Sequence, residues 1–304
     1  MRQESLELIR QILQPSDLLL DEPMKNHTTF RAGGNAAVFL TPENEEQLSK
    51  VLQILREKNE DYYILGKGSN LLVSDRGYAG TVIQIYENMS FIRFTDTVME
   101  VSAGVLLSQA ASAACEHELT GMEFASGIPG TLGGAVVMNA GAYGEEMKQI
   151  VKSVRVLQDH GQILTLGCED MEFGYRTSLI KKRPYIVLSA ELQLIPGEQN
   201  QIRERMNELK TKRIEKQPLE YPSAGSTFKR PEGYFAGKLI MDAGLQGHQI
   251  GGAQVSEKHC GFIINRKDAT ASEIIMLIRY VVQEVNRQFG VTLEPEVCML
   301  GEFD

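Results

Sequence analysis

The spacing of apolar residues along the chain predicts several amphipathic helices. Near the start, Leu6, Ile9, Ile12 and Leu13 recur at helical spacing within a polar stretch, so they share one helix face. Similar spacing predicts helices over 43–58 and 271–289. Alanine-rich, charged or short apolar stretches predict further helices over 106–117, 199–216 and 235–243. Apolar faces of this kind need a core to pack against, which indicates a globular chain.

Capping residues mark two of the expected helix starts. Thr41 followed by Pro42 predicts an N-cap and a first helical residue, because proline lacks an N–H group that would be unsatisfied there. Thr270 and Glu273 form the pattern of a capping box at the start of the helix over 271–289.

Short apolar runs predict strands between the helices. We expect strands over 36–40, 62–65, 71–74, 81–85, 91–94, 98–103, 150–158, 162–167, 185–194, 261–265 and 291–300. Strands dominate from residue 80 onward, and the charged helix over 199–216 leads into a last unit. Domain boundaries are therefore expected near residues 77 and 200.

Two glycine-rich stretches interrupt this pattern, LGKGSNL at 65–71 and GMEFASGIPGTLGGAVVMNAGAYG at 121–144. Glycine raises the entropy cost of folding and gives no side chain to pack, so this density predicts bare backbone that approaches a ligand. Main-chain N–H groups in turns and at helix starts suit phosphate. The pentapeptide GKGSN alone fits a tight hairpin turn equally well, whereas the second stretch is too long for one turn. Neither a P-loop nor a Rossmann fingerprint is present.

Composition narrows the classes of function. The 304 residues include 31 Lys and Arg against 40 Asp and Glu, a net charge of −9, which argues against a broad nucleic-acid surface. There is no run of roughly 18 apolar residues to span a membrane, and the first helix lacks the apolar core of a secretory signal. Four dispersed cysteines and five histidines predict neither a zinc site nor a disulfide framework, and they favour a reducing cytoplasm.

Several polar positions have both a chemical and an ordinary structural explanation. Arg176, beside Tyr175 in a loop, could bind a carboxylate or remain a solvated charge. Ser226 could donate a proton or be a turn serine, and no GxSxG elbow or His–Asp pair predicts a hydrolase triad. In a strand, Glu294 and Glu296 would point to one face, where two carboxylates need a partner or a proton.

Eight short motifs, taken in order, resemble those of one enzyme family. They are HTTFRAGG (27–34), LGKGSNL (65–71), SGIPGTLGG (126–134), NAGAYG (139–144), GYR (174–176), KQP (216–218), AGSTFK (224–229) and LEPEV (293–297). Each motif alone is weak, but together they cover the chain after residue 23. The sequence is therefore similar to UDP-N-acetylenolpyruvoylglucosamine reductases, the flavoenzymes of bacterial peptidoglycan precursor synthesis.

The resemblance implies an α+β fold that binds FAD. The FAD-binding part would be of the vanillyl-alcohol-oxidase type, with subdomains over 1–77 and 78–200, followed by an α+β substrate domain over 201–304. GKGSN contains no His or Cys for covalent attachment, so the FAD should be noncovalent. The implied FAD-binding residues are Gly66, Lys67, Gly68, Ser69, Asn70, Leu71, Ser126, Gly127, Ile128, Pro129, Gly130, Thr131, Gly133, Gly134, Asn139, Ala140 and Gly141.

The resemblance also implies a two-stage reaction. NADPH reduces FAD, and hydride then passes from FAD N5 to the enolpyruvyl group of UDP-N-acetylglucosamine enolpyruvate, which gives UDP-N-acetylmuramate. Hydride addition leaves an enediolate that needs charge neutralisation and a proton. By similarity, Arg176 neutralises the charge with Glu296 as its partner, and Ser226 gives the proton. The implied substrate-binding residues are Tyr175, Lys216, Lys229 and Arg230, with Lys212 and Arg213 as basic neighbours of Lys216.

The chain departs from the pattern of the longer family members at two places. Arg230 stands where longer members have an asparagine, and the chain between 176 and 199 is too short for their tyrosine-bearing loop, so the shorter form is expected.

The alternative functions are another FAD-dependent oxidase or dehydrogenase and a non-catalytic nucleotide-sugar-binding protein. A noncovalent flavin argues against the first, and retention of Arg176, Ser226 and Glu296 argues against the second. The expected partners are small molecules, without nucleic acid or membrane, and the sequence gives no information on protein partners.

Overall fold

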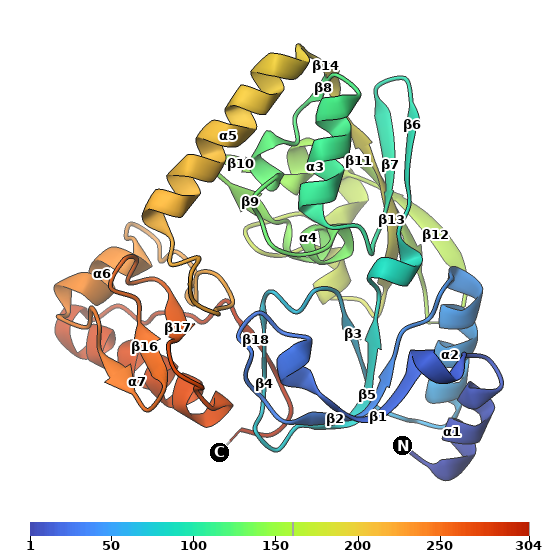
Figure 1. Cartoon of the computed structure of the whole chain (residues 1–304), viewed down its shortest axis with the longest axis horizontal. Coiled ribbons are helices and arrows are strands. Elements are labelled where there is room, and N and C mark those ends of the chain that lie inside the picture. Colours follow the sequence, from blue (N-terminus) through green and yellow to red (C-terminus); the bar gives the residue numbers. More distant parts are fainter. Residues whose placement is uncertain (160, 304) are drawn as a thin grey trace. The chain divides into compact units, whose positions relative to one another are not determined.

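The structure is a computed structural model that describes residues 1–159 and 161–303. The chain forms two compact units. The first contains residues 1–19, 39–67 and 80–213, and the second contains residues 20–38, 68–79 and 214–304. Each unit is therefore assembled from segments that lie far apart in the sequence, and Figure 1 labels their helices and strands. The assignment of 1–77, 78–200 and 201–304 to separate domains stays a prediction.

A five-stranded antiparallel sheet lies in the first unit, in the order β12-β11-β13-β7-β6. Its central strand β13 is buried along almost its whole length, as an apolar run flanked by two neighbours should be. Helix α4 packs against β13 and β7 (Figure 1). The elements are β6 (Ile92–Thr95), β7 (Val98–Ser102), β11 (Val151–Leu157), β12 (Ile163–Gly167), β13 (Ile186–Gln193), α3 (Leu107–Glu116) and α4 (Leu132–Met138).

A four-stranded sheet has the order β1-β2-β5-β3. Strands β3 and β5 are parallel, and Tyr62 lies opposite Thr81. Helices α1 and α2 pack on each other, and their buried Leu6, Ile9, Leu48 and Leu52 confirm the predicted apolar faces. The elements are β1 (Leu18–Pro23), β2 (Asn35–Leu40), β3 (Tyr62–Leu65), β5 (Tyr78–Gln84), α1 (Gln3–Arg10) and α2 (Glu45–Glu57).

Short strand pairs and most of one long helix complete the first unit, and the last three residues of that helix belong to the second. Strand β8 pairs with β14, and β9 pairs with β10, both antiparallel. The charged helix α5 begins and ends at the predicted residues. The elements are β8 (Leu119–Thr120), β9 (Gly141–Ala142), β10 (Glu145–Glu146), β14 (Ile195–Pro196) and α5 (Gln199–Lys216).

The second unit has one apolar core built from all three of its segments. Phe30 and Leu72 are fully buried there together with the apolar face of α7, which packs on the sheet β15-β16-β17 (Figure 1). The side chain of Asn265 donates to the carbonyl of Phe30 at 2.9 Å. The elements are β4 (Leu71–Val73), β15 (Gln249–Ile250), β16 (Ala253–Val255), β17 (Ile263–Asn265), β18 (Cys298–Leu300), α6 (Ala236–Asp242) and α7 (Ala271–Phe289).

Helix starts show where local sequence signals compete. Asn44, not Thr41, caps α2, because the Asn44 side chain accepts a hydrogen bond from the Gln47 N–H at 2.9 Å. The prediction of Thr41 and Pro42 as cap and first residue was therefore wrong. The capping box of Thr270 and Glu273 on α7 is confirmed.

Three further elements differ from the expectation. The predicted strand over 291–300 is regular only in β18, where it pairs in parallel with β4. The glycine-rich stretch contains α4, a helix that its glycine content did not suggest. Strand β1 was not predicted at all.

Asp75 is expected to stabilise the second unit by capping α7. Its carboxylate accepts hydrogen bonds from the N–H groups of Ala271 and Ser272 at 2.7 and 2.8 Å, and an acidic group is favourable at a helix N-terminus. We expect Asp75→Ala to lower the free energy of unfolding by about 1–2 kcal/mol in denaturant titrations. The exposed Glu232→Ala removes the same charge as a control, and equal effects of both variants would contradict the prediction.

Candidate active site

The two glycine-rich stretches meet in the first unit through bare backbone. A Cβ on Gly66 would lie 2.5 Å from the Thr131 hydroxyl, so any side chain at this position would displace the second stretch. The carbonyl of Gly66 accepts a hydrogen bond from the Gln84 side chain at 2.9 Å. Lys67 directs its amine to the Tyr86 hydroxyl at 3.1 Å, and it remains exposed. These contacts hold the start of GKGSN against the start of α4.

Helix α4 begins directly after this contact. Thr131 is its N-cap, with the hydroxyl accepting from the Gly134 N–H at 3.5 Å. Gly133 packs so closely on Ala103 that an added Cβ would lie 2.9 Å from the Ala103 Cβ. At Gly134, by contrast, an added Cβ would meet nothing closer than the Thr131 hydroxyl at 3.7 Å. Gly133 is therefore close-packed, whereas there is open space beside the Cα atom of Gly134.

The rest of GKGSN belongs to the second unit. Gly68 has φ +67°, and a Cβ there would overlap the His27 carbonyl, so only glycine fits. Its carbonyl accepts from the Thr29 N–H at 3.1 Å. The buried hydroxyls of Thr28 and Thr29 form no hydrogen bond with any described residue. Buried hydroxyls normally have a partner, so these two groups are suited to a ligand that carries acceptor oxygens.

In the second unit, the Thr28 and Thr29 hydroxyls beside Gly68 thus fit a phosphate-bearing cofactor such as FAD. In the first unit, the second glycine-rich stretch leaves open space beside Gly134. Sequence analysis did not single out Thr28 and Thr29, although HTTFRAGG was among the motifs that carried the resemblance. Other polar groups of the second stretch bond internally. The Ser126 hydroxyl donates to the Glu123 carbonyl at 2.7 Å, and the Ala140 N–H donates to the Ala135 carbonyl at 2.8 Å.

Ser226 and Glu296 lie on adjacent backbone segments of the second unit. The Glu296 N–H donates to the Thr227 carbonyl at 2.8 Å, and Phe228 pairs with Pro295. On the other side of this segment, the Thr227 N–H donates to the Gly261 carbonyl at 2.8 Å. Ser226 is exposed and Glu296 is half-buried. Pairing on both sides fixes the backbone that carries Ser226.

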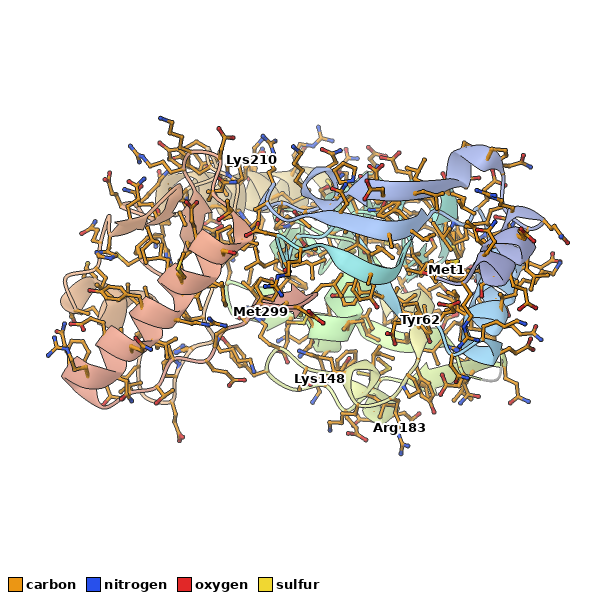
Figure 2. The ribbon with its side chains drawn as sticks, turned by 90° about the horizontal axis from the view of Figure 1, so that it is seen from below. Met1, Tyr62, Lys148, Arg183, Lys210 and Met299 are labelled. Atoms are coloured by element: carbon orange, nitrogen blue, oxygen red, sulfur yellow. The ribbon has the colours of Figure 1, made fainter. Side chains whose placement is uncertain are left out.

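Asn70 connects the first glycine-rich stretch with the segment of Glu296. Its side-chain amide donates to the Glu296 carbonyl at 3.2 Å, and its own carbonyl accepts from the Cys298 N–H at 3.0 Å. Strand β4 then continues in parallel with β18, which contains Met299 (Figure 2). Asn70 therefore orients Glu296 from a position 226 residues away in the sequence.

The basic residues assigned to substrate have different surroundings. Lys229 forms an ion pair with Glu294, so these two side chains neutralise each other. Arg230 is exposed, lies 4.1 Å from the centre of the Phe235 ring and donates to the Tyr234 carbonyl at 3.3 Å. Lys216 is exposed at the C-terminal end of α5, and no described residue forms an ion pair with it.

Arg176 lies in a tight turn of the first unit. Its guanidinium lies 5.2 Å from the centre of the Tyr175 ring, and it donates to the Gly141 carbonyl at 3.3 Å. Tyr175 is 53% exposed, whereas Arg176 is half-buried. The structure therefore brings the GYR and NAGAYG motifs into direct contact.

Arg213 turns inward from α5 toward the second glycine-rich stretch. A Cβ on Gly127 would lie 3.2 Å from Arg213 Cδ and 3.4 Å from Nη1. Burial lowers the pKa of the Arg213 guanidinium, and in the described chain no carboxylate pairs with it. Arg205 and Lys212 on the same helix, by contrast, both pair with Glu208. A buried cation without a protein counter-ion suits an anionic ligand.

His259 packs behind the segment that carries Ser226. Its Nδ1 accepts from the Gly261 N–H at 3.1 Å, and the Gly261 carbonyl in turn holds Thr227. Burial lowers the pKa of the His259 imidazole. A neutral ring with Nδ1 as acceptor fits this arrangement, because a protonated ring would present a donor to another donor.

Across residues 1–159 and 161–303, no three His, Cys, Asp or Glu side chains form a group that could hold a metal ion. Within the same residues, no helix is both long enough and apolar enough to cross a membrane.

Family models match most of the chain. One described as an FAD binding domain matches residues 36–167, and one described as the C-terminal domain of UDP-N-acetylenolpyruvoylglucosamine reductase matches residues 217–300. A UDP-N-acetylenolpyruvoylglucosamine reductase from Clostridioides difficile is 53% identical over 291 residues, with 96% of each chain covered. Another from Caldanaerobacter subterraneus is 50% identical over 294 residues, with 97% of each chain covered.

Solved structures agree with these matches. The crystal structure of the Thermus caldophilus UDP-N-acetylenolpyruvylglucosamine reductase has a TM-score of 0.79 at 34% identity, covering 94% of this chain and 98% of that one. Phl p 4.0202, a glucose dehydrogenase, has a TM-score of 0.52 at 12% identity, covering 65% of this chain and 45% of that one. The second likeness concerns the fold alone. The α+β fold of the vanillyl-alcohol-oxidase type, expected from the sequence, is confirmed.

The lowered pKa of His259 predicts a pH-dependent contribution to stability. When pH falls below 6.5, the ordinary value for histidine, the unfolded chain binds a proton that the folded chain takes up only at lower pH. The contribution of the neutral ring is therefore complete above pH 6.5 and declines below it. We expect the difference in unfolding free energy between the wild type and His259→Gln to shrink from pH 8 to pH 5.5, measured with urea. A constant difference would contradict this.

Proposed function

The chain belongs to the family of UDP-N-acetylenolpyruvoylglucosamine reductases, and from this premise we propose which of its residues carry the reaction. It is an FAD-dependent oxidoreductase of peptidoglycan precursor synthesis. The main support for these residue roles is the 2.8 Å hydrogen bond from the Glu296 N–H to the Thr227 carbonyl. This bond holds Ser226 and Glu296 on neighbouring segments.

We assign FAD binding to the glycine-rich stretches and to the threonines beside them. The hydroxyls of Thr28 and Thr29 would donate to phosphate oxygens. The space beside Gly134 would let a cofactor approach the start of α4, whose first N–H groups already bond to the protein. When bound, FAD supplies the hydride that is added to the enolpyruvyl group. NADPH is the proposed source of that hydride. Lys67 and Ser69 complete the proposed FAD-binding set in GKGSN, with their backbone as the contacting part.

Arg176 is proposed to bind the substrate carboxylate and to neutralise the charge that grows there. A guanidinium donates two parallel hydrogen bonds to a carboxylate and stays protonated throughout. The cation is oriented by contacts to Tyr175 and Gly141, so little reorganisation is needed when charge develops. Glu296, whose backbone carbonyl is held by Asn70, is proposed to take part in binding the same substrate carboxylate.

Ser226 is the proposed proton donor. Addition of hydride at the methylene carbon leaves an enediolate, and its neighbouring carbon then takes the hydroxyl proton of Ser226. Ser226 is exposed on a backbone that is paired on both sides, so its hydroxyl is both accessible and held in place. The proton is regained from solvent or from Lys229, which lies on the same segment.

The substrate diphosphate is assigned to the basic side chains of the second unit. Lys216 is exposed and available as a point charge, and Arg230 and Lys229 lie beside Ser226 in the sequence. Lys229 would have to exchange its ion pair with Glu294 for phosphate. Arg230 would keep the stacking on Phe235 while donating to an oxygen, in place of the asparagine of the longer form.

We assign Arg213 to FAD, not to the substrate diphosphate that its position beside Lys216 in the sequence suggested. Its guanidinium packs on Gly127, within the stretch proposed to bind FAD. An arginine held there can supply positive charge to an anionic cofactor.

We also propose that subdomains over 1–77 and 78–200 bind FAD and that residues 201–304 bind the nucleotide sugar. The proposed location is the cytoplasm. All four cysteines are free thiols, which suits a reducing compartment.

Replacement of Ser226 separates the two half-reactions. We expect Ser226→Ala to bind FAD normally and to be bleached by anaerobic NADPH at the wild-type rate. Its reoxidation by the enolpyruvyl nucleotide sugar should slow about 10²- to 10⁴-fold, because the proton donor is lost. Stopped-flow absorbance of the flavin measures both steps. Ser223→Ala, in the same segment, should keep wild-type rates, and slower bleaching in Ser226→Ala would refute the assignment.

Removal of the Arg213 charge should weaken FAD binding. A charge-assisted hydrogen bond contributes about 1.5–3 kcal/mol, so Arg213→Ala should raise the Kd for FAD roughly ten- to a hundred-fold. Reconstitution of the apoprotein, followed by flavin fluorescence, gives this Kd. Arg205→Ala removes a paired, exposed charge from the same helix and should leave the Kd unchanged. If Arg213→Ala binds FAD normally but the nucleotide sugar weakly, the residue serves the substrate diphosphate instead.

A further inference from the structure

The turn that carries Arg176 has a strained backbone. Gly174 and Thr177 exchange hydrogen bonds in both directions, at 3.1 and 3.3 Å, so Tyr175 and Arg176 form the tip of a tight turn. Arg176 has φ +56°, a left-handed conformation that favours glycine or asparagine and costs an arginine about 1 kcal/mol or more. Such a conformation persists only when surrounding contacts hold it.

Asn139 holds one end of this turn. It is fully buried and ends α4 in the left-handed conformation, with φ +43°. Its side-chain amide donates to the Gly174 carbonyl at 3.1 Å, and its side-chain oxygen accepts from the Lys148 N–H at 2.9 Å (Lys148 is labelled in Figure 2). Each polar atom of the side chain therefore bonds to the protein backbone.

Ser178 holds the other end of the turn. It is also fully buried, and its hydroxyl donates to the Val137 carbonyl at 2.8 Å, in the last turn of α4. The Arg176 guanidinium donates to the Gly141 carbonyl, two residues beyond Asn139. The turn over 174–178 and the stretch over 137–141 are therefore tied together at both ends and at the tip.

We propose that Asn139 and Ser178 are positioning residues for Arg176, and that they fasten its strained turn to the end of α4. This proposal deepens the function above and rests on it. It replaces the expectation that the Asn139 side chain binds FAD, because both of its polar atoms are engaged. A helix end in the left-handed conformation needs only glycine. The two side-chain hydrogen bonds therefore point to a second task, which is to hold Gly174.

Two substitutions at Asn139 separate its contacts. Asn139→Asp keeps an oxygen for the Lys148 N–H but loses the donor to Gly174. Asn139→Gly keeps the backbone conformation and loses both bonds. In each variant the Kd for FAD, the flavin absorption spectrum and the rate of bleaching by NADPH should equal those of the wild type. Reoxidation by the enolpyruvyl nucleotide sugar should slow about ten- to a hundred-fold, because displacement of a catalytic group by about 1 Å has this effect.

Ser178 gives an independent test of the same idea. Ser178→Ala should slow reoxidation in the same way, and Ser178→Thr, which retains the hydroxyl, should restore it. Ser102→Ala is the matched control for stability. Ser102 is a buried serine of the same unit that bonds to backbone groups of Met89 and Phe91, far from residue 176 in the sequence. This control should lose stability without slowing reoxidation.

A double-mutant cycle decides whether Asn139 acts through Arg176. If it does, adding Asn139→Gly to Arg176→Ala causes no further slowing of reoxidation. Additive effects, a weaker affinity for FAD, a shifted flavin spectrum in Asn139→Asp, or equal slowing in Ser102→Ala would each overturn the proposal. Failure of the nucleotide sugar to reoxidise the wild-type enzyme would instead overturn the proposed function itself.

Discussion

Close approach of bare backbone is the constraint on which both glycine-rich stretches depend. Gly66 leaves room for the Thr131 hydroxyl, Gly133 for Ala103, and Gly68 for the His27 carbonyl. A Cβ at any of these positions would force the partner away. The start of α4 and the GKGSN turn therefore owe their geometry to absent side chains.

Polar side chains hold the segments that carry the proposed catalytic residues. In the first unit, Asn139 and Ser178 bind the turn of Arg176 to the end of α4. In the second, Asn70 binds the backbone of Glu296, and His259 supports the strand beside Ser226 through Gly261. In each case a buried or half-buried amide, hydroxyl or imidazole bonds to main chain and not to another side chain. Such bonds are costly to leave unmade, so the supporting residues hold their partners in one geometry.

The distribution of charge distinguishes structural cations from available ones. Arg155 pairs with Glu45, and Arg205 and Lys212 pair with Glu208, so these cations are already neutralised. Arg213 is buried without such a partner in the described chain, and Lys216 is exposed. A chain with a net charge of −9 can thus bind anionic nucleotides, because a few unpaired cations act locally while the acidic groups lie elsewhere.

The sequence by itself determined the helices with strong apolar periodicity, the capping box of α7, and the family, because these depend on neighbouring residues or on the order of motifs. The glycine-rich stretches indicated a phosphate-bearing ligand, and the family resemblance identified that ligand as FAD. Only the tertiary structure decided that Asn44 caps α2, that Asn139 holds Gly174, and that Arg213 faces Gly127. The last two contacts join residues far apart in the sequence. A side chain such as Asn139 bonds equally well to a ligand or to backbone, so its role follows from which group the fold brings within about 3 Å.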